Sequence, residues 1–379
     1  MRVVIDTRNM GQNGGTGIAT YARMLSSTCE ERDFCVAWLN AQHRGKEVRS
    51  GFFGRFGRSL RGRRRPLAIG GNYEVADLYR TAVSRYRIFS KVTILENDAP
   101  PDIMHWSCPL PLRWNGVANI VTIHDLIPML HPTLAPTVYG NIRKFLQDCC
   151  DNASAIVTVS EAVRDDILCH LDVPAAKVVN LSQAVSFDVG LMAAAEIAEP
   201  ICPEGGFLYF GLLERRKNLV RLIRAHGQSR SRRPLTLIGT QGHGGDEILA
   251  ERERHPEPER VRIIPWARRE QLLRAIKVSR AVVFPSLAEG FGLPIIEAML
   301  LGTPVLTSRG HATEEVAGGS ALLVDPLSTA ELVRGLIDLD EDEALIDRMK
   351  IQGAKRAASF STAVYGERLA AFYRNVATL

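Results

Sequence analysis

The chain has 379 residues, 46% of them hydrophobic, and a formal net charge of +5, a length that suggests two domains or one large one. No run of about 18 apolar residues occurs, so we expect no membrane span, and the strand-like start at Arg2–Asp6 predicts no signal peptide. The seven cysteines form no Cys-x-x-Cys pair, so neither a zinc site nor a disulfide framework is indicated and a cytoplasmic setting is expected.

Short runs of buried-type residues alternate with helical patterns along the chain, which predicts parallel α/β sheets. The expected strands are 3–6, 35–39, 119–123 and 155–159, then 206–210, 235–239, 261–264, 281–284, 304–307 and 321–324. The segment 192–206 is rich in Ala, Glu, Pro and Gly and reads as a linker. We therefore expect two Rossmann-like domains, 1–195 and 204–359, with a last amphipathic helix near 362–377 in a C-terminal segment, 360–379, that joins the first domain.

The first strand is followed by a glycine-rich loop that contains Gly15 and Gly17 and precedes a helix. Glycines let the backbone approach a ligand closely. The spacing is not the GxGxxG of a dinucleotide-binding fold with its acidic ribose ligand, so a dehydrogenase is disfavoured.

The stretch 44–65 is strongly basic, with Phe52, Phe53 and Phe56 interleaved. Its charged residues are Arg44, Lys46, Arg49, Arg55, Arg58, Arg61, Arg63, Arg64 and Arg65, against Glu47 alone. This composition is compatible with an anionic membrane surface or an acceptor, with a solvated loop, or with nucleic acid. We expect no nucleic-acid partner and treat membrane contact and a solvated loop as the open alternatives; with membrane contact, the protein would lie at the inner face of the cytoplasmic membrane.

His124 and Asp125 directly follow the expected strand 119–123. They therefore lie at the carboxyl end of a strand, where open α/β sheets bind ligands. Ser160 follows the next strand, and it could contact a ligand or cap a helix that has Glu161 in its first turn.

In the second half, Gly211 follows a strand, and Arg216 and Lys217 come just before a helix. A strand, a glycine and cations at a helix start form a phosphate-binding arrangement, in which arginine offers a fork of donors and lysine a point charge. Gly239 and Trp266 each follow a later strand. The Trp266 indole could stack on a base, or it could be a core or surface side chain.

The most informative string is 285–298, which follows the strand 281–284 and holds Glu289 and Glu297 eight positions apart. Pro294 suits the first position of a helix, so Glu297 is expected in the first turn, where the helix dipole favours a carboxylate. Glu289 stays on the preceding loop. The two carboxylates and free backbone N–H groups would surround a volume suited to a ligand with hydroxyls and phosphate.

This string resembles the E-x7-E signature of the retaining GT-B glycosyltransferases, glycosyltransferase family 4. The segments 122–128, 158–164 and 211–219 resemble other motifs of that family, and they occur along the chain in the family's order. The resemblance implies the GT-B fold: two Rossmann-like domains facing an interdomain cleft.

The resemblance also implies roles for individual residues. Glu289 would face the donor sugar, Glu297 would hold the nucleotide ribose, Arg216 and Lys217 would clamp the donor diphosphate, and His124 would lie near the transferred sugar. Further nucleotide-sugar contacts are implied at Gly15, Gly17, Gly211, Gly239, Trp266, Gly290, Phe291, Gly292 and Leu293.

The expected activity is metal-independent, retaining transfer of a hexose, with mannose from GDP-mannose favoured, to a sugar or lipid-linked sugar in surface polysaccharide or lipopolysaccharide assembly. A UDP-sugar donor, a nucleotide-sugar epimerase of the same fold and a non-catalytic scaffold are the alternatives. No cofactor is expected. The Asp338-Leu339-Asp340 string formally matches a metal-binding DxD motif, but it lies in an acidic helical run and reads as a solvated face.

Overall fold

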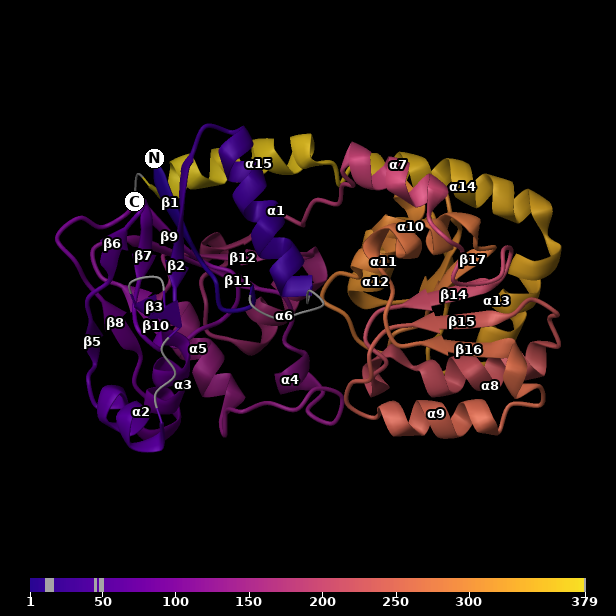
Figure 1. Cartoon of the computed structure of the whole chain (residues 1–379), viewed down its shortest axis with the longest axis horizontal. Coiled ribbons are helices and arrows are strands. Elements are labelled where there is room, and N and C mark those ends of the chain that lie inside the picture. Colours follow the sequence, from indigo (N-terminus) through magenta and orange to yellow (C-terminus); the bar gives the residue numbers. More distant parts are fainter. Residues whose placement is uncertain (11–16, 44–45, 48–50, 378–379) are drawn as a thin grey trace. The chain divides into compact units, whose positions relative to one another are not determined.

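A computed structural model describes residues 1–10, 17–43, 46–47 and 51–377 (Figure 1). The chain divides into two compact units. Unit 1 comprises Met1–Leu130, Thr137–Ala184 and Thr362–Leu379, and unit 2 comprises His131–Pro136 and Val185–Ser361.

Unit 1 is built on an eight-stranded sheet with the order β13-β12-β11-β9-β1-β2-β7-β6. All neighbours are parallel except β6, which pairs antiparallel with β7. The strands are β1 (Arg2–Asp6), β2 (Cys35–Asn40), β6 (Leu67–Ile69), β7 (Asn72–Glu74), β9 (Ile103–Trp106), β11 (Ala118–Ile123), β12 (Ala155–Thr158) and β13 (Val178–Asn180). The helices of this unit are α1 (Gly17–Glu31), α2 (Phe52–Ser59), α3 (Leu78–Phe89), α4 (Ile127–Leu130), α5 (Ile142–Asn152), α6 (Glu161–His170) and α15 (Thr362–Val376).

Both faces of this sheet are buried. Successive residues of a strand point to opposite faces, so one strand contributes to two core clusters. Val3 and Ile5 belong to a core cluster with residues of α1 and α15. Val4 belongs to a second cluster with residues of α3, α5 and α6. Because both faces are buried, the strands appear in the sequence as continuous apolar runs.

A smaller sheet, β10-β8-β5, lies beside this core and is parallel throughout. Its strands are β5 (Arg63–Arg64), β8 (Thr93–Leu95) and β10 (Leu112–Trp114), and a short antiparallel pair joins β3 (Gln42–His43) to β4 (Lys46–Glu47). Part of the basic stretch 44–65 thus forms α2 and β5, and α2 packs against α3 (Figure 1).

Unit 2 has a six-stranded parallel sheet with the order β16-β15-β14-β17-β18-β19. Its strands are β14 (Phe207–Phe210), β15 (Leu235–Ile238), β16 (Val261–Ile264), β17 (Ala281–Phe284), β18 (Val305–Ser308) and β19 (Leu322–Val324). Its helices are α7 (Val189–Ile197), α8 (Leu219–Ser229), α9 (Gly245–Glu253), α10 (Arg269–Val278), α11 (Leu293–Leu300), α12 (His311–Ala317), α13 (Thr329–Glu341) and α14 (Glu343–Ala358). This strand order places the topological switch point between β14 and β17.

The segment expected as a linker is partly helical, and unit 2 begins earlier than the sequence suggests. The boundary lies between Ala184 and Val185, because α7 packs against α10. The Glu196 carboxylate of α7 forms an ion pair with Lys277 of α10. The Glu196 backbone carbonyl accepts a 2.5 Å hydrogen bond from Arg274, also on α10.

The last helix, α15, packs against α1 and is tied to the sheet of unit 1 by a buried polar chain. His105 on β9 bonds to the Tyr373 hydroxyl at 2.6 Å through Nδ1 and to the Thr122 hydroxyl at 2.7 Å through Nε2. Thr122 in turn lies 2.9 Å from the Tyr21 hydroxyl. Burial, with a smaller effect of His124, lowers the pKa of His105 to about 3, so this imidazole is neutral.

Tyr373→Phe should destabilise the protein by about 1–3 kcal/mol, because it leaves a buried ring nitrogen without its partner. Thr93→Val is the control, since it also removes a buried hydroxyl, and that hydroxyl has no hydrogen-bond partner among the described residues. Urea unfolding of both variants measures the difference. Equal losses of unfolding free energy in the two variants would contradict the stabilising role of the His105–Tyr373 hydrogen bond.

Candidate active site

Two loops of unit 2 meet at the switch point of its sheet. One follows β14 and runs from Gly211 to Asn218, and the other follows β17 and ends at Gly292. Because β14 and β17 are neighbouring parallel strands, their carboxyl ends share one edge of the sheet. The loops touch directly: the Leu287 N–H donates to the Arg216 carbonyl at 2.7 Å.

Asn218 fixes the turn that aims the cations. Its backbone is left-handed, with φ of 61°, which asparagine tolerates better than most residues. Its side-chain amide donates to the carbonyls of Pro285 at 3.1 Å and Pro326 at 2.7 Å. The turn ends the short 3₁₀ segment Arg215–Lys217 and starts α8 at Leu219.

The two cations converge on one carboxylate. The Lys217 ammonium lies 2.5 Å from one oxygen of Glu289, and the Arg216 guanidinium lies 2.7 Å from the other. Arg216 also pairs with Glu214 at 2.6 Å. Lys217 and Glu289 are each only 7% exposed, so the ion pair is screened little by solvent. The structure therefore brings together three of the four residues expected to be catalytic.

The surroundings set the protonation of this group. Burial alone would raise the pKa of the Glu289 carboxyl, but Lys217 and Arg216, with hydrogen bonds from Lys217 and Ser286, lower this pKa to about 2. Burial lowers the pKa of the Lys217 ammonium, against the opposing effect of Glu289. The Lys217 nitrogen also lies 4.8 Å from the centre of the Phe284 ring, a cation–π distance.

Gly211 and Gly239 are required by a close approach of two backbones. Gly211 has a φ of 133° and Gly239 a φ of 157°. A Cβ atom on Gly239 would lie 1.8 Å from the Gly211 carbonyl oxygen. Gly239 therefore has no room for a side chain, whereas a Cβ atom on Gly211 would lie 3.1 Å from the Tyr209 hydroxyl, so at Gly211 the positive φ is the main constraint.

Helix α11 begins at Leu293, one residue earlier than expected, because Gly292 takes a left-handed conformation with φ of 100° and caps the helix. Pro294 is therefore the second helical residue, and the first turn contains no acidic residue. The expectation that Glu297 lies in that turn was wrong. Phe291 is buried and packs edge-on against Phe360, with ring centres 5.5 Å apart, so it anchors the loop.

Glu297 forms a second ionic contact, separate from that of Glu289. It is 8% exposed and pairs with Arg269 at the start of α10. The Arg269 guanidinium also lies 5.4 Å from the centre of the Phe187 ring. A carboxylate held this way keeps one oxygen free to accept a hydrogen bond from a ligand hydroxyl.

Trp266 follows β16 and is 62% exposed, so it is not a core side chain. The Trp266 indole is therefore either a surface side chain or a platform on which a base could stack.

Gly290 is buried on the loop between Glu289 and Phe291.

His124 lies in unit 1, at the carboxyl end of β11. Its Nε2 lies 2.8 Å from the Ser107 carbonyl oxygen, and because a carbonyl only accepts, Nε2 carries the proton. The Tyr21 ring packs edge-on against it, with centres 4.9 Å apart. Burial lowers the pKa of His124, so a neutral ring with an unprotonated Nδ1 is favoured. The Asp125 carboxylate accepts the Ile127 N–H at 3.0 Å and holds the loop.

Other sequence expectations fall in different places. Gly15 lies outside the described residues, and Gly17 is the first residue of α1. The Ser160 hydroxyl accepts the Val163 N–H at 3.2 Å, which confirms the cap interpretation. Asp340 lies on α13 and pairs with Arg233 at 2.5 Å, so it anchors the helix.

Within the described ranges, no group of three His, Cys, Asp or Glu side chains is arranged to hold a metal ion. Over the same ranges, no helix combines the length and apolar character needed to cross a membrane.

Two family models match consecutive parts of the chain. The model described as Glycosyltransferase Family 4 matches residues 15–187, and the model described as Glycosyl transferases group 1 matches residues 204–356. The chain belongs to the group 1, family 4 glycosyltransferases.

Two relatives agree with this assignment. Over 252 residues the glycosyltransferase is 30% identical to O-antigen chain mannosyltransferase B of Escherichia coli, covering 64% of this chain and 66% of that protein. It is 26% identical over 264 residues to the serotype-specific mannosyltransferase WbdA of the same species, covering 65% of this chain but 32% of that longer protein.

The fold is GT-B. Sucrose-phosphate synthase from Thermosynechococcus elongatus aligns with a TM-score of 0.72 and 16% identity, over 99% of this chain and 98% of that one. Anabaena HepE, solved with UDP and glucose, aligns with a TM-score of 0.67 and 15% identity, over 99% and 100% of the two chains.

Sequence reasoning missed three residues that contact the expected site residues: Glu214 and Arg269 in unit 2, and Tyr21 in unit 1. Glu214 directly precedes the cations, and a carboxylate there was a visible signal of an ion pair. Arg269 and Tyr21 carried no such signal, because their partners are distant in sequence.

Glu289→Gln should lower the free energy of unfolding by about 3 kcal/mol at pH 7, the value of a carboxyl pKa that folding lowers from 4.5 to about 2. A lowered pKa stabilises the fold above the unfolded value, near 4.5, and this contribution disappears as pH falls through about 2. Urea unfolding of wild type and variant between pH 7 and pH 3 should therefore show a shrinking difference.

Glu247→Gln is the matched control, because it removes an exposed ion pair with Arg215 and should cost no more than about 1 kcal/mol. A Glu289→Gln difference that stayed constant down to pH 3 would contradict the assignment.

Proposed function

We propose that this glycosyltransferase transfers mannose from GDP-mannose, with retention of anomeric configuration, to a sugar hydroxyl in bacterial surface polysaccharide or lipopolysaccharide assembly. The convergence of Lys217 and Arg216 on Glu289 carries the proposal. Support for mannose comes from the names of the relatives, an O-antigen chain mannosyltransferase and a serotype-specific mannosyltransferase.

The leaving group accounts for the two cations. When the bond between the anomeric carbon and the diphosphate oxygen breaks, its electron pair stays on the diphosphate. Lys217, which is buried, and Arg216, which is partly buried, stabilise this charge from fixed positions, and low exposure makes electrostatic stabilisation more effective. Their combined charge serves a metal-independent reaction.

The acceptor hydroxyl then forms the new bond to the anomeric carbon on the face that the diphosphate leaves, and its proton passes to the leaving diphosphate oxygen. Glu289 positions the donor sugar, and Glu297 accepts a hydrogen bond from the nucleotide ribose. His124, neutral and bonded through Nε2 to Ser107, has an Nδ1 that accepts from a hydroxyl of the transferred sugar. Trp266 provides an exposed ring face for the base.

The donor is tested by thermal stabilisation with GDP and with UDP, each with and without EDTA. Ligand at about 100 times its dissociation constant adds roughly 2.7 kcal/mol of stability. We expect a shift with GDP that EDTA does not change and that Glu297→Ala weakens. A shift selective for UDP would overturn the donor assignment, and no shift with either nucleotide would overturn the function and favour a scaffold.

Lys217→Ala should lower kcat/KM for transfer from GDP-mannose by at least about 100-fold, because it removes a charge that stabilises the leaving group. Lys350→Ala is the control, an exposed lysine on α14. Radiolabelled transfer to a mannose-containing acceptor measures both. Full activity of Lys217→Ala would refute the mechanism, and a change of the donor sugar without acceptor would indicate an epimerase.

Peripheral membrane contact through the stretch 44–65 is a further part of the proposal. Helix α2 leaves Phe56 45% exposed and Leu60, just after it, 55% exposed. Arg55, Arg58 and Arg61 accompany them in the sequence. Exposed apolar side chains beside cations are the composition of a surface that binds anionic lipid.

Phe56→Ser should weaken binding to vesicles of phosphatidylglycerol and phosphatidylcholine by about fivefold or more, the effect of removing roughly 1 kcal/mol of apolar burial. Ile351→Ser is the control, since Ile351 is 61% exposed on α14. Co-sedimentation measures both variants. Absence of wild-type binding, or an equal loss in the control, would refute the contact.

A further inference from the structure

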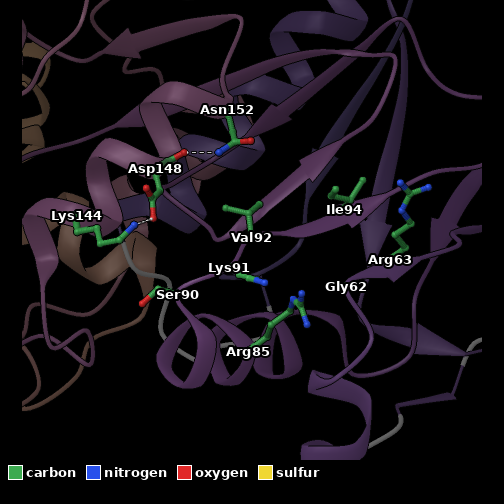
Figure 2. Close-up of a pocket in the computed structure, with 10 residues that line it drawn as sticks. All are labelled: Gly62, Arg63, Arg85, Ser90, Lys91, Val92, Ile94, Lys144, Asp148 and Asn152. Carbon is green, nitrogen blue, oxygen red and sulfur yellow. Dashed lines mark hydrogen bonds and ion pairs between the residues drawn. The ribbon is translucent and has the colours of Figure 1, made fainter.

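A basic pocket lies in unit 1, away from the edge of the sheet that carries His124. It has a volume of about 490 Å³, within the range of about 300–1,000 Å³ that is typical of small-molecule sites. Figure 2 shows its walls, which come from the end of α3, from β5 and β8, and from α5. Asn152 ends α5 just before β12, so this part of the pocket lies at the amino edge of the sheet, whereas His124 lies at the carboxyl edge.

Four cations line the pocket, and two of them are neutralised by carboxylates. Arg63 pairs with Glu96 at 3.2 Å, and Lys144 pairs with Asp148 at 2.6 Å. The other two cations are Arg85 and Lys91. In the part of the chain that the structure describes, neither Arg85 nor Lys91 has a carboxylate within ion-pair distance.

The Arg85 side chain is held in place by groups that carry no net charge. Its guanidinium donates to the carbonyls of Ser59 at 2.9 Å and Leu60 at 3.1 Å. Its Nε is buried and has no hydrogen-bond partner among the described residues. Gly62 makes room for it, since a Cβ atom there would lie 2.8 Å from a guanidinium nitrogen. The remaining guanidinium nitrogen, Nη2, has no hydrogen-bond partner among the described residues, so it is the donor that this fixed side chain offers to an anion.

Lys91 supplies the second charge, and the back of the pocket is apolar. Lys91 follows α3 and is exposed. Arg85 and Lys91 both line the pocket, and Figure 2 draws them below Val92, on the wall that also carries Ile94. The pocket therefore combines two uncompensated positive charges with a small apolar surface.

We propose that this pocket binds a phosphate monoester. A phosphate monoester carries a charge of about −1.5 to −2 near pH 7 and three acceptor oxygens, which matches two cations, whereas a carboxylate carries a single charge. The Arg85 Nη2 and the Lys91 ammonium contact the phosphate oxygens, and Val92 and Ile94 contact the organic group attached to it. The source is either a lipid headgroup or a soluble phosphate ester. This assignment does not depend on the donor or on the glycosyl transfer.

Lysine acetylation with acetic anhydride, read by mass spectrometry, tests the pocket locally and is insensitive to anion binding at Lys217. Inorganic phosphate at about ten times its dissociation constant should slow acetylation of Lys91 about tenfold by mass action. Lys350, exposed in unit 2, is the internal control. Arg85→Gln should abolish the protection of Lys91, and Arg87→Gln, which changes an exposed arginine on the same helix outside the pocket, should preserve it.

Vesicles of phosphatidic acid in phosphatidylcholine distinguish the two sources, because phosphatidic acid is a phosphate monoester and phosphatidylglycerol is a diester of lower charge. Protection by inorganic phosphate alone indicates a soluble ester, and protection by phosphatidic acid vesicles alone indicates a lipid. Absence of protection by both, equal protection by phosphatidylglycerol vesicles, or protection that survives in Arg85→Gln would each overturn the proposal.

Discussion

The site of unit 2 depends on one buried carboxylate, Glu289, that neutralises Lys217 and Arg216. Leaving the buried Lys217 ammonium without a counter-charge would cost several kcal/mol, whereas Arg216 is partly exposed and also pairs with Glu214. Glu289 removes this cost and, at the same time, links the loop after β14 to the loop after β17. The ion pairs therefore position the cations and hold the two loops together in a single arrangement.

This arrangement follows from the strand order. In a parallel sheet with the order of unit 2, the chain leaves β14 and β17 in opposite directions, and a crevice opens between their loops. Gly211 and Gly239 allow the neighbouring loops to approach closely, and Asn218 reverses the chain so that α8 starts behind the cations. Each of these residues has a backbone conformation or a close contact that few other residue types could satisfy.

The parts of this structure that were predictable from sequence have local causes. The strands 281–284 and 261–264 were predicted at the observed residues, because parallel strands buried on both faces read as short apolar runs. Arg216 and Lys217 were singled out because cations at a helix start indicate phosphate binding, and Glu289 was singled out by the family resemblance; the structure brings the three side chains together. The strand Ile103–Trp106 was missed, since the polar His105 interrupts its apolar run.

What could not be predicted depends on distant partners. The His105 Nδ1 bonds to the hydroxyl of Tyr373, which lies 268 positions later in the sequence. No local sequence pattern predicts such a contact. The pairing of Arg269 with Glu297 and of Tyr21 with His124 is set by tertiary packing in the same way. Helix α11 starts one residue before the predicted start, because Gly292 adopts a left-handed conformation and caps the helix. The prediction placed the start at Pro294, since proline favours the first helical position.

The ion pairs also bear on how the proposed reaction would begin. A donor diphosphate that binds Arg216 and Lys217 competes with Glu289 for the same N–H groups, because each cation has few donors directed into the site. The diphosphate thus takes over the neutralising role, and the Glu289 oxygens become free to accept hydrogen bonds from sugar hydroxyls. Glu289 remains ionised during this exchange, since its pKa of about 2 lies far below neutral pH. In the proposed reaction one carboxylate would therefore stabilise the empty site and orient the sugar in the filled one, and the positive charge needed by the leaving group would be in place before the bond breaks.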